Sequence, residues 1–173
     1  MGTVAIHRAN REDLKDLQIV SRTTFKESFG EQNTPEDMEK YLKEKFSEQQ
    51  LFLELDNPDS LFYLAKLNEE VVGYLKLNTG QAQTELKNEN GLEIERIYVI
   101  NKFIGKGIGK QLFNLTIDIA QQEKIQYIWL GVWEKNERAL NFYHKNGFVE
   151  FDKHIFVLGD DHQTDILMKL KLN

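Results

Sequence analysis

The segment from Ile104 to Lys110, with the sequence Ile-Gly-Lys-Gly-Ile-Gly-Lys, has the residue types of an anion-binding turn. It follows a predicted strand, residues 93–99, and opens a segment with helical spacing from Gly107 to about Gln121. The first backbone N–H groups of a helix have no partner within the helix and lie at the positive end of its dipole. Glycines let an anion approach these groups because no Cβ stands in the way. The turn therefore predicts a phosphate or pyrophosphate site.

A second group of residues with chemical interest lies downstream, between Asn136 and Phe148. Asn136 is a good helix N-cap, since its side chain can accept from a backbone N–H of the first turn. Ala139, Phe142 and Tyr143 then form an apolar stripe at helical spacing. On these residues alone, Tyr143 is a core residue of the helix.

The composition limits the class of protein. The chain has 173 residues, 40% of them hydrophobic and 29% charged, so we expect one domain over residues 1–173. The absence of cysteine excludes a disulfide framework, a thiolate zinc site and a cysteine nucleophile, and the four histidines are too scattered to suggest a metal site. Without an apolar run near the roughly 20 residues of a membrane span, and without a signal peptide, a cytoplasmic location is expected. The net charge of −6 argues against nucleic-acid binding and suits a cationic substrate.

The elements that position these residues follow from apolar periodicity and capping residues. Helix starts are expected at Asn10, Thr34 and Ser47, in addition to the two helices above. The polar segment 78–91 is expected to be a loop. The order of strands and helices predicts an α/β protein with a mixed sheet. The expected strands are 4–9, 61–67, 71–77, 92–99, 127–132, 148–158 and 165–172.

The strand before the glycine-rich turn has an irregular apolar pattern. Leu92 and Ile94 lie on one phase of its alternation, whereas Ile97 and Val99 lie on the other. A regular strand cannot place all four on one face, because its side-chain period is two. One extra residue at 95–96 would restore the register, which predicts a β-bulge there. Such a bulge would splay the strand from its neighbour and free backbone N–H groups for a ligand. The alternative is a strand buried on both faces.

With these elements and motifs in order, the chain resembles the GCN5-related N-acetyltransferases (GNAT). Their pyrophosphate loop, Gln/Arg-x-x-Gly-x-Gly/Ala, is matched by residues 104–109, although Ile104 stands where the family has Gln or Arg. The resemblance implies a GNAT fold: a mixed, mostly antiparallel central sheet with a splayed central strand pair, flanked by helices. It also implies acetyl-CoA as co-substrate and no metal. The other matching residues are Glu95, Tyr98 and Val99 in the strand and Asn136, Ala139, Phe142, Tyr143, Gly147 and Phe148 downstream.

A closer likeness is to the Pai-type spermidine/spermine acetyltransferases of Gram-positive bacteria. It depends chiefly on residues 129–136, Trp-Leu-Gly-Val-Trp-Glu-Lys-Asn, with further matches at 29–36, 92–98 and 159–165. It implies acetyl transfer to a primary amine of a small cationic polyamine, by direct attack in a ternary complex, with no nucleic acid or membrane as partner. Acetylation of a protein N-terminus or lysine, and a non-catalytic regulator that senses CoA or polyamine, stay open as alternatives. A homodimer also stays open.

Amine acetylation needs a neutral amine. An alkylammonium with a pKa of about 10.4 is neutral in roughly one molecule in a thousand at pH 7, so a base or a water relay is expected. Glu93 and Glu95 are the candidate bases, because they flank the predicted bulge and alternate side chains of a strand share a face. A solvated edge, or an ion pair with Arg96, is the alternative interpretation of these carboxylates.

The resemblance also assigns contacts with the acetyl donor. The backbone N–H of Val99 is expected to donate to the thioester carbonyl, with Ile97 and Tyr98 completing an edge that pairs with the pantetheine arm. Tyr143 is expected to protonate the leaving thiolate, and Asn136 to contact CoA as well as cap its helix. The expected phosphate-binding residues are Gly105, Lys106, Gly107, Ile108, Gly109 and Lys110.

Overall fold

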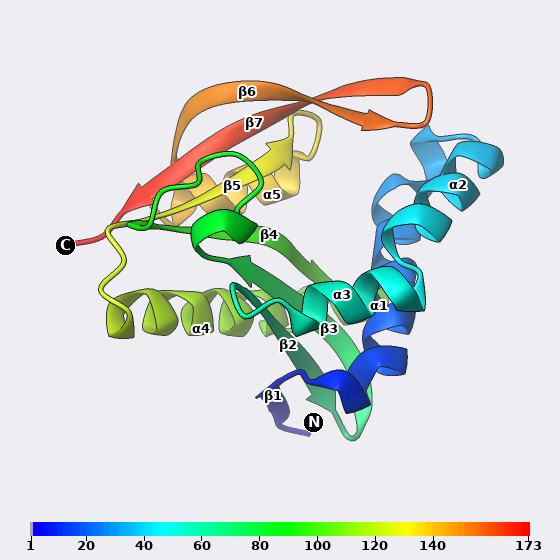
Figure 1. The fold of residues 1–173 in the computed structure, drawn as a ribbon, viewed down its shortest axis with the longest axis horizontal. Helices are drawn as coiled ribbons and strands as arrows, with labels where there is room; N and C mark the ends of the chain where they lie inside the picture. Colours follow the sequence, from blue (N-terminus) through cyan, green and yellow to red (C-terminus); the bar gives the residue numbers. More distant parts are fainter. Residues whose placement is uncertain (1) are drawn as a thin grey trace.

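The computed structural model describes residues 2–173 and places seven strands in one twisted sheet (Figure 1). The strands are β1 (Val4–Arg8), β2 (Ser60–Leu67), β3 (Glu70–Asn78), β4 (Gly91–Val99), β5 (Tyr127–Trp133), β6 (Val149–Leu158) and β7 (Asp161–Lys171). Their order in the sheet is β1-β2-β3-β4-β5-β7-β6. Only the central pair, β4 and β5, is parallel, and every other neighbouring pair is antiparallel. The predicted α/β class with a mixed, mostly antiparallel sheet is confirmed.

The helices begin where the capping residues predict. Thr34 accepts from the backbone N–H of Asp37 at 3.1 Å, and Ser47 accepts from that of Gln50 at 3.2 Å. Asn10 caps a short 3-10 turn, after which the first α-helix begins. The α-helices are α1 (Leu14–Phe29), α2 (Pro35–Lys45), α3 (Glu48–Asp56), α4 (Ile108–Gln122) and α5 (Glu137–Lys145), and the 3-10 turns are η1 (Arg11–Asp13), η2 (Gly30–Gln32), η3 (Gly80–Ala82) and η4 (Asn101–Phe103). Within residues 2–173, no helix combines the length and apolar character of a membrane span.

Two apolar clusters lie on opposite faces of the sheet. Helices α4 and α5 cover one face, where Leu112 and Tyr143 pack with Leu75 and other strand residues. Helices α1, α2 and α3 cover the other face, where the packing includes Leu42 and Tyr74. Alternate side chains of β3, such as Tyr74 and Leu75, enter the two clusters in turn, as the two-residue period of a strand requires.

The two sheet hairpins differ in how well their bounds could be predicted. Asn68 and Glu69 connect β2 to β3 with positive φ at both residues, the conformation of a tight hairpin turn, so this predicted hairpin is confirmed. The closing hairpin pairs further than predicted, because Leu158 already faces Asp161 across the turn at Gly159. The first residues of β7 are polar and show no apolar alternation, which is why the sequence places its start too late.

Candidate active site

The predicted β-bulge is present in β4. Arg96 lies opposite Lys76 and Ile94 lies opposite Leu77, so that Glu95 has no partner residue on β3. The two apolar phases of the strand thereby reach one face: Leu92 and Ile94 are buried in the cluster under α4, and Ile97 and Val99 pack against the same cluster. The alternative, a strand buried on both faces, holds for the first four residues of β4, at 91–94.

The bulge coincides with the place where β4 and β5 separate. These strands pair only from Gly91 to Ile94 on β4 and from Tyr127 to Leu130 on β5, so their remaining residues diverge (Figure 1). The predicted splayed central pair is therefore confirmed.

The divergence leaves backbone groups of β4 free on one side. Ile100 donates its N–H to the carbonyl of Val72 at 2.9 Å, across the β3 side. In an antiparallel ladder, hydrogen-bonding groups point to the two sides alternately, so Tyr98 also faces β3 while Ile97 and Val99 face the opening toward β5. The N–H and C=O groups of these two residues are thus available to an extended ligand arm.

A cleft of about 1280 Å³ occupies the opening, and residues of α5 and of α1 and α2 line it. Its wall on the side of α5 includes Val132, Asn136 and Tyr143. The opposite side reaches α1, α2 and α3, with Phe29 and Tyr41 in its lining. The cleft therefore reaches both faces of the sheet beside the bulge.

The glycine-rich turn follows directly after the cleft, because Ile104 lines the cleft and residues 105–110 do not. Gly105 and Gly107 have φ of 88° and 81°, a region that L-residues with a side chain rarely adopt, and no atom lies within 4 Å of a Cβ built on either. The first helical hydrogen bond runs from the N–H of Gln111 to the carbonyl of Gly107 at 3.1 Å, which leaves the preceding amides without helical partners. Ile104 lines the cleft itself. This open cradle of amides fits an anion such as a pyrophosphate.

The two lysines of this turn already contact neighbouring side chains. The ammonium of Lys106 lies 5.5 Å from the ring centre of Phe103. That of Lys110 donates to the side-chain oxygen of Asn146 at 2.5 Å, which ties α4 to the end of α5. Lys106 is thus the less constrained of the two lysines predicted to meet CoA phosphates.

The α5 residues have both structural and cleft-facing positions. The side-chain oxygen of Asn136 accepts from the N–H of Ala139 at 3.2 Å, so the predicted N-cap is confirmed. The ring of Tyr143 packs edge-on against Phe142 and Phe148, with centroids 5.5 and 5.4 Å away, and is 6% exposed. Burial raises the pKa of Tyr143 well above its ordinary value, so its phenol stays protonated. Tyr143 is a core residue that also lines the cleft.

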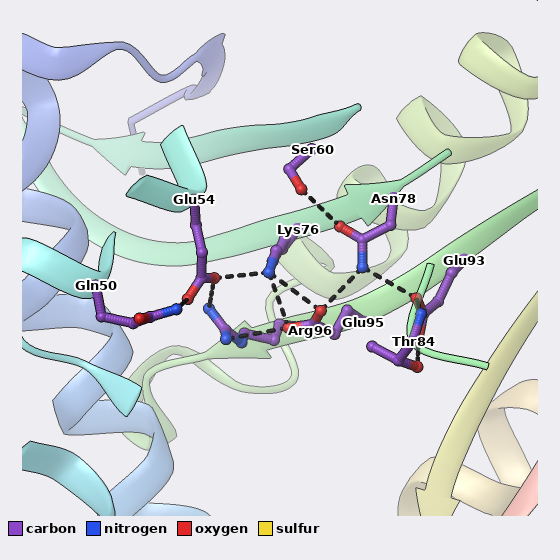
Figure 2. Close-up of polar contacts among 9 residues, drawn as sticks. All are labelled: Gln50, Glu54, Ser60, Lys76, Asn78, Thr84, Glu93, Glu95 and Arg96. Carbon is purple, nitrogen blue, oxygen red and sulfur yellow. Dashed lines mark hydrogen bonds and ion pairs between the residues drawn. The ribbon is translucent and has the colours of Figure 1, made fainter. Parts of the chain in front are cut away.

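The two candidate bases occupy different electrostatic surroundings (Figure 2). Glu95 is held by Lys76, whose ammonium lies 3.1 Å from both carboxylate oxygens, and by Arg96 at 3.0 Å. Burial would raise the pKa of Glu95, but the charges of Arg96 and Lys76 outweigh it and lower the pKa. The ion pair with Arg96 that the sequence left as an alternative is present.

Within residues 2–173, Glu93 has no such cationic partner. Its carboxylate accepts from the amide of Asn78 at 3.0 Å and from the backbone N–H and hydroxyl of Thr84 at 2.8 and 2.6 Å. Burial and the nearby charge of Glu95 raise the pKa of Glu93, although the hydrogen bonds from Asn78 and Thr84 oppose the shift. Of the two carboxylates, Glu93 is therefore the stronger proton acceptor once it is ionised.

A segment of the loop between β3 and β4, Gln83-Thr84-Glu85, was not singled out from the sequence. Gln83 accepts from the indole N–H of Trp129 on β5 at 2.7 Å, Thr84 holds Glu93 on β4, and Glu85 lies 2.9 Å from the ring of His154 on β6. The loop thereby closes one wall of the cleft. No local pattern marks it, because its partners lie on three different strands.

Known proteins share both the sequence motifs and the fold of this chain. A sequence model described as "Acetyltransferase (GNAT) family" matches residues 22–148, and the chain belongs to this family. The chain is 46% identical over 172 residues, 99% of each protein, to an uncharacterized N-acetyltransferase of Lactobacillus delbrueckii subsp. lactis. The chain is accordingly an N-acetyltransferase of the GNAT type that uses acetyl-CoA.

More distant relatives have named substrates or ligands. The chain is 28% identical to a spermidine N(1)-acetyltransferase of Thermoplasma acidophilum, over 84% of this chain and 88% of the relative. The crystal structure of the PaiA N-acetyltransferase from the same organism in complex with coenzyme A superimposes with a TM-score of 0.81 and 27% identity, covering 98% of this chain and 99% of that one. The GNAT fold expected from the sequence is confirmed.

Proposed function

We propose that this enzyme acetylates a primary amine of a polyamine such as spermidine or spermine, by direct attack in a ternary complex. The carrying observation is a group of carboxylates on one wall of the cleft. Glu85, Glu93 and Asp165 line it, and within residues 2–173 none of them pairs with a lysine or arginine. His154 lies between two of them, 2.9 Å from Glu85 and 3.5 Å from Asp165. Such a wall favours an acceptor that carries positive charges at intervals.

The acetyl donor would enter from the α4 side. Its pantetheine arm would pair with the free backbone groups of Ile97 and Val99, and its pyrophosphate would lie on the amides of the turn at 105–110. These amides can bind the anion without the polar side chain that Ile104 lacks. Bound there, acetyl-CoA would supply an activated thioester, and the N–H of Val99 would donate to its carbonyl oxygen.

The transfer would then use one carboxylate and one phenol. The amine nitrogen attacks the thioester carbonyl carbon, a C–N bond forms and the C–S bond breaks. The proton lost from the amine goes to Glu93, directly or through a water, and the leaving thiolate takes the proton of Tyr143. We assign the base to Glu93 rather than Glu95, because Lys76 and Arg96 hold Glu95 as an anion with low proton affinity.

The test is an acceptor panel with the purified protein. Release of the CoA thiol is followed with spermidine, spermine, a peptide with a free N-terminus and a peptide with an internal lysine, and the products are identified by mass spectrometry. We expect polyamine turnover well above peptide turnover. If only a peptide is acetylated, the acceptor is a protein amine and not a polyamine. If the protein binds CoA but transfers the acetyl group to no amine, the regulator alternative is favoured.

A pair of loop variants tests the charge argument. Glu85→Gln should raise KM for spermidine with little change in kcat, because it removes a charge from the cleft wall and leaves the reacting groups in place. Glu89→Gln, an exposed residue of the same loop, is the matched control and should leave both constants unchanged. Equal behaviour of the two variants would contradict the assignment of the acidic wall to the acceptor.

A further inference from the structure

Four charged side chains form a closed ring next to Glu93 (Figure 2). Lys76 lies 2.6 Å from Glu54 and 3.1 Å from Glu95, and Arg96 lies 3.1 Å from Glu54 and 3.0 Å from Glu95. The side chains come from α3, β3 and the bulge of β4, and the most exposed of them is only 19% exposed. With two cations and two carboxylates, the ring has no net charge.

Asn78 connects this ring to Glu93. Its amide nitrogen donates to Glu95 at 2.9 Å and to Glu93 at 3.0 Å, and its oxygen accepts from the hydroxyl of Ser60 at 3.0 Å. Carboxylates can only accept, so the NH₂ group must face them, and one N–H is used for each. The fully buried Asn78 thus holds the carboxylate of Glu93 at a fixed place beside the ring.

We propose that the ring of Glu54, Lys76, Glu95 and Arg96 is a positioning device for Glu93: Asn78 ties the carboxylate of Glu93 to the ring, and the balance of charge in the ring sets how readily Glu93 takes the amine proton. The inference rests on the proposed role of Glu93 as proton acceptor. An unpaired carboxylate in the ring would raise the pKa of Glu93 and favour its protonated form. An unpaired cation in the ring would lower the pKa and make Glu93 a weaker base. The ring therefore acts through Glu93 and needs no contact with the substrate.

Other ionisable groups also face this region. The loop from β3 to β4 contributes Glu85, which pairs with His154 of β6, and β7 contributes Asp165 on the other side of the same imidazole. On β5, the residue opposite Glu93 is Trp129, whose indole N–H is committed to Gln83. None of these groups contacts the four ring residues, so variants of the ring leave them in place.

Two variants of opposite charge give the test. Lys76→Met leaves the ring with one excess negative charge, and Glu54→Gln leaves it with one excess positive charge. The acid limb of kcat/KM for spermidine should move to higher pH in the first variant and to lower pH in the second, by about one pH unit each. Lys66→Met, which removes a strand lysine paired with Asp16 at 3.6 Å, is the control and should not move the limb.

A structural role alone predicts another outcome. Loss of packing would lower activity or melting temperature in both variants without moving the limb in opposite directions, and that result would overturn the proposal. Where Lys76→Met does not fold, Lys76→Gln retains a hydrogen-bond donor and tests the same charge change.

A direct titration separates the ring from the proposed chemistry. The carboxyl carbon of Glu93 is followed by NMR in the wild type and the ring variants, and its pKa should move in the same two directions without any turnover. If Glu93→Gln keeps the acid limb, the role of Glu93 as base is wrong, while the titration still decides whether the ring sets its charge. An unmoved carboxyl titration in both ring variants contradicts the inference.

Discussion

Replacement of Tyr143 by Phe separates the two roles that the structure gives this side chain. Phe keeps the edge-on packing against Phe142 and Phe148, and the Tyr143 hydroxyl forms no hydrogen bond with another side chain of residues 2–173. The structural cost should therefore stay below about 1 kcal/mol. Loss of a positioned proton donor lowers rates by about 10²- to 10⁴-fold, which corresponds to about 2.7 to 5.4 kcal/mol of transition-state stabilisation.

The small loss of folding stability and the large loss of rate are far enough apart to be distinguished in one variant. We expect Tyr143→Phe to lower kcat and kcat/KM for spermidine equally, with KM and CoA affinity unchanged, because the donor acts only as the C–S bond breaks. The melting temperature should change by no more than about 4 °C. Since burial raises the pKa of Tyr143 above its ordinary value, the wild type should show no alkaline loss of activity from this residue within a normal assay range.

Tyr127→Phe is the matched control, because it removes the phenol of a β5 residue that does not line the cleft. It should leave both rate constants unchanged. Activity of Tyr143→Phe within about threefold of the wild type, well short of the loss expected for a proton donor, would refute the reasoning. Tyr143 would then be a core residue alone.

Three further predictions concern the turn, the cap and the base. Gly107→Ala forces a Cβ into φ of 81° at a cost of about 1 to 2 kcal/mol and should weaken CoA binding by calorimetry, whereas Gly30→Ala, at φ of −63°, should be neutral. Asn136→Ala should lose about 1 kcal/mol of stability with the cap, and Asn136→Ser should restore it in thermal denaturation. Because burial raises the pKa of Glu93, its contribution to stability is full below the ordinary value of 4.5 and is lost as pH rises through the folded value. As the pH rises through the folded pKa of Glu93, the melting temperature of Glu93→Gln should therefore fall less than that of the wild type. Equal pH dependence of the two melting temperatures would contradict the raised pKa.

The main features of the fold could be predicted because they depend on local signals. Thr34 and Ser47 begin helices with their own side chains, and the turn at 68–69 fixes a hairpin. The bulge at Glu95 could be predicted for the same reason, since apolar residues that change phase within one strand reach a single face only if one residue is inserted between them. Residues 161–164 gave no such signal, and the start of β7 was placed too late.

The electrostatic difference between Glu93 and Glu95 could not be predicted, because it is created by residues far away in the chain. Two carboxylates at alternate positions of one strand are equivalent in sequence. Lys76 and Glu54 reach the second from β3 and α3, and Thr84 reaches the first from a loop that has no motif. Lys76 and Arg96 hold Glu95, whereas Asn78 and Thr84 hold Glu93, so different neighbours assign different chemistry to two identical side chains. If that assignment is correct, charge changes at Lys76 and Glu54 must alter the acidity of Glu93 in opposite directions.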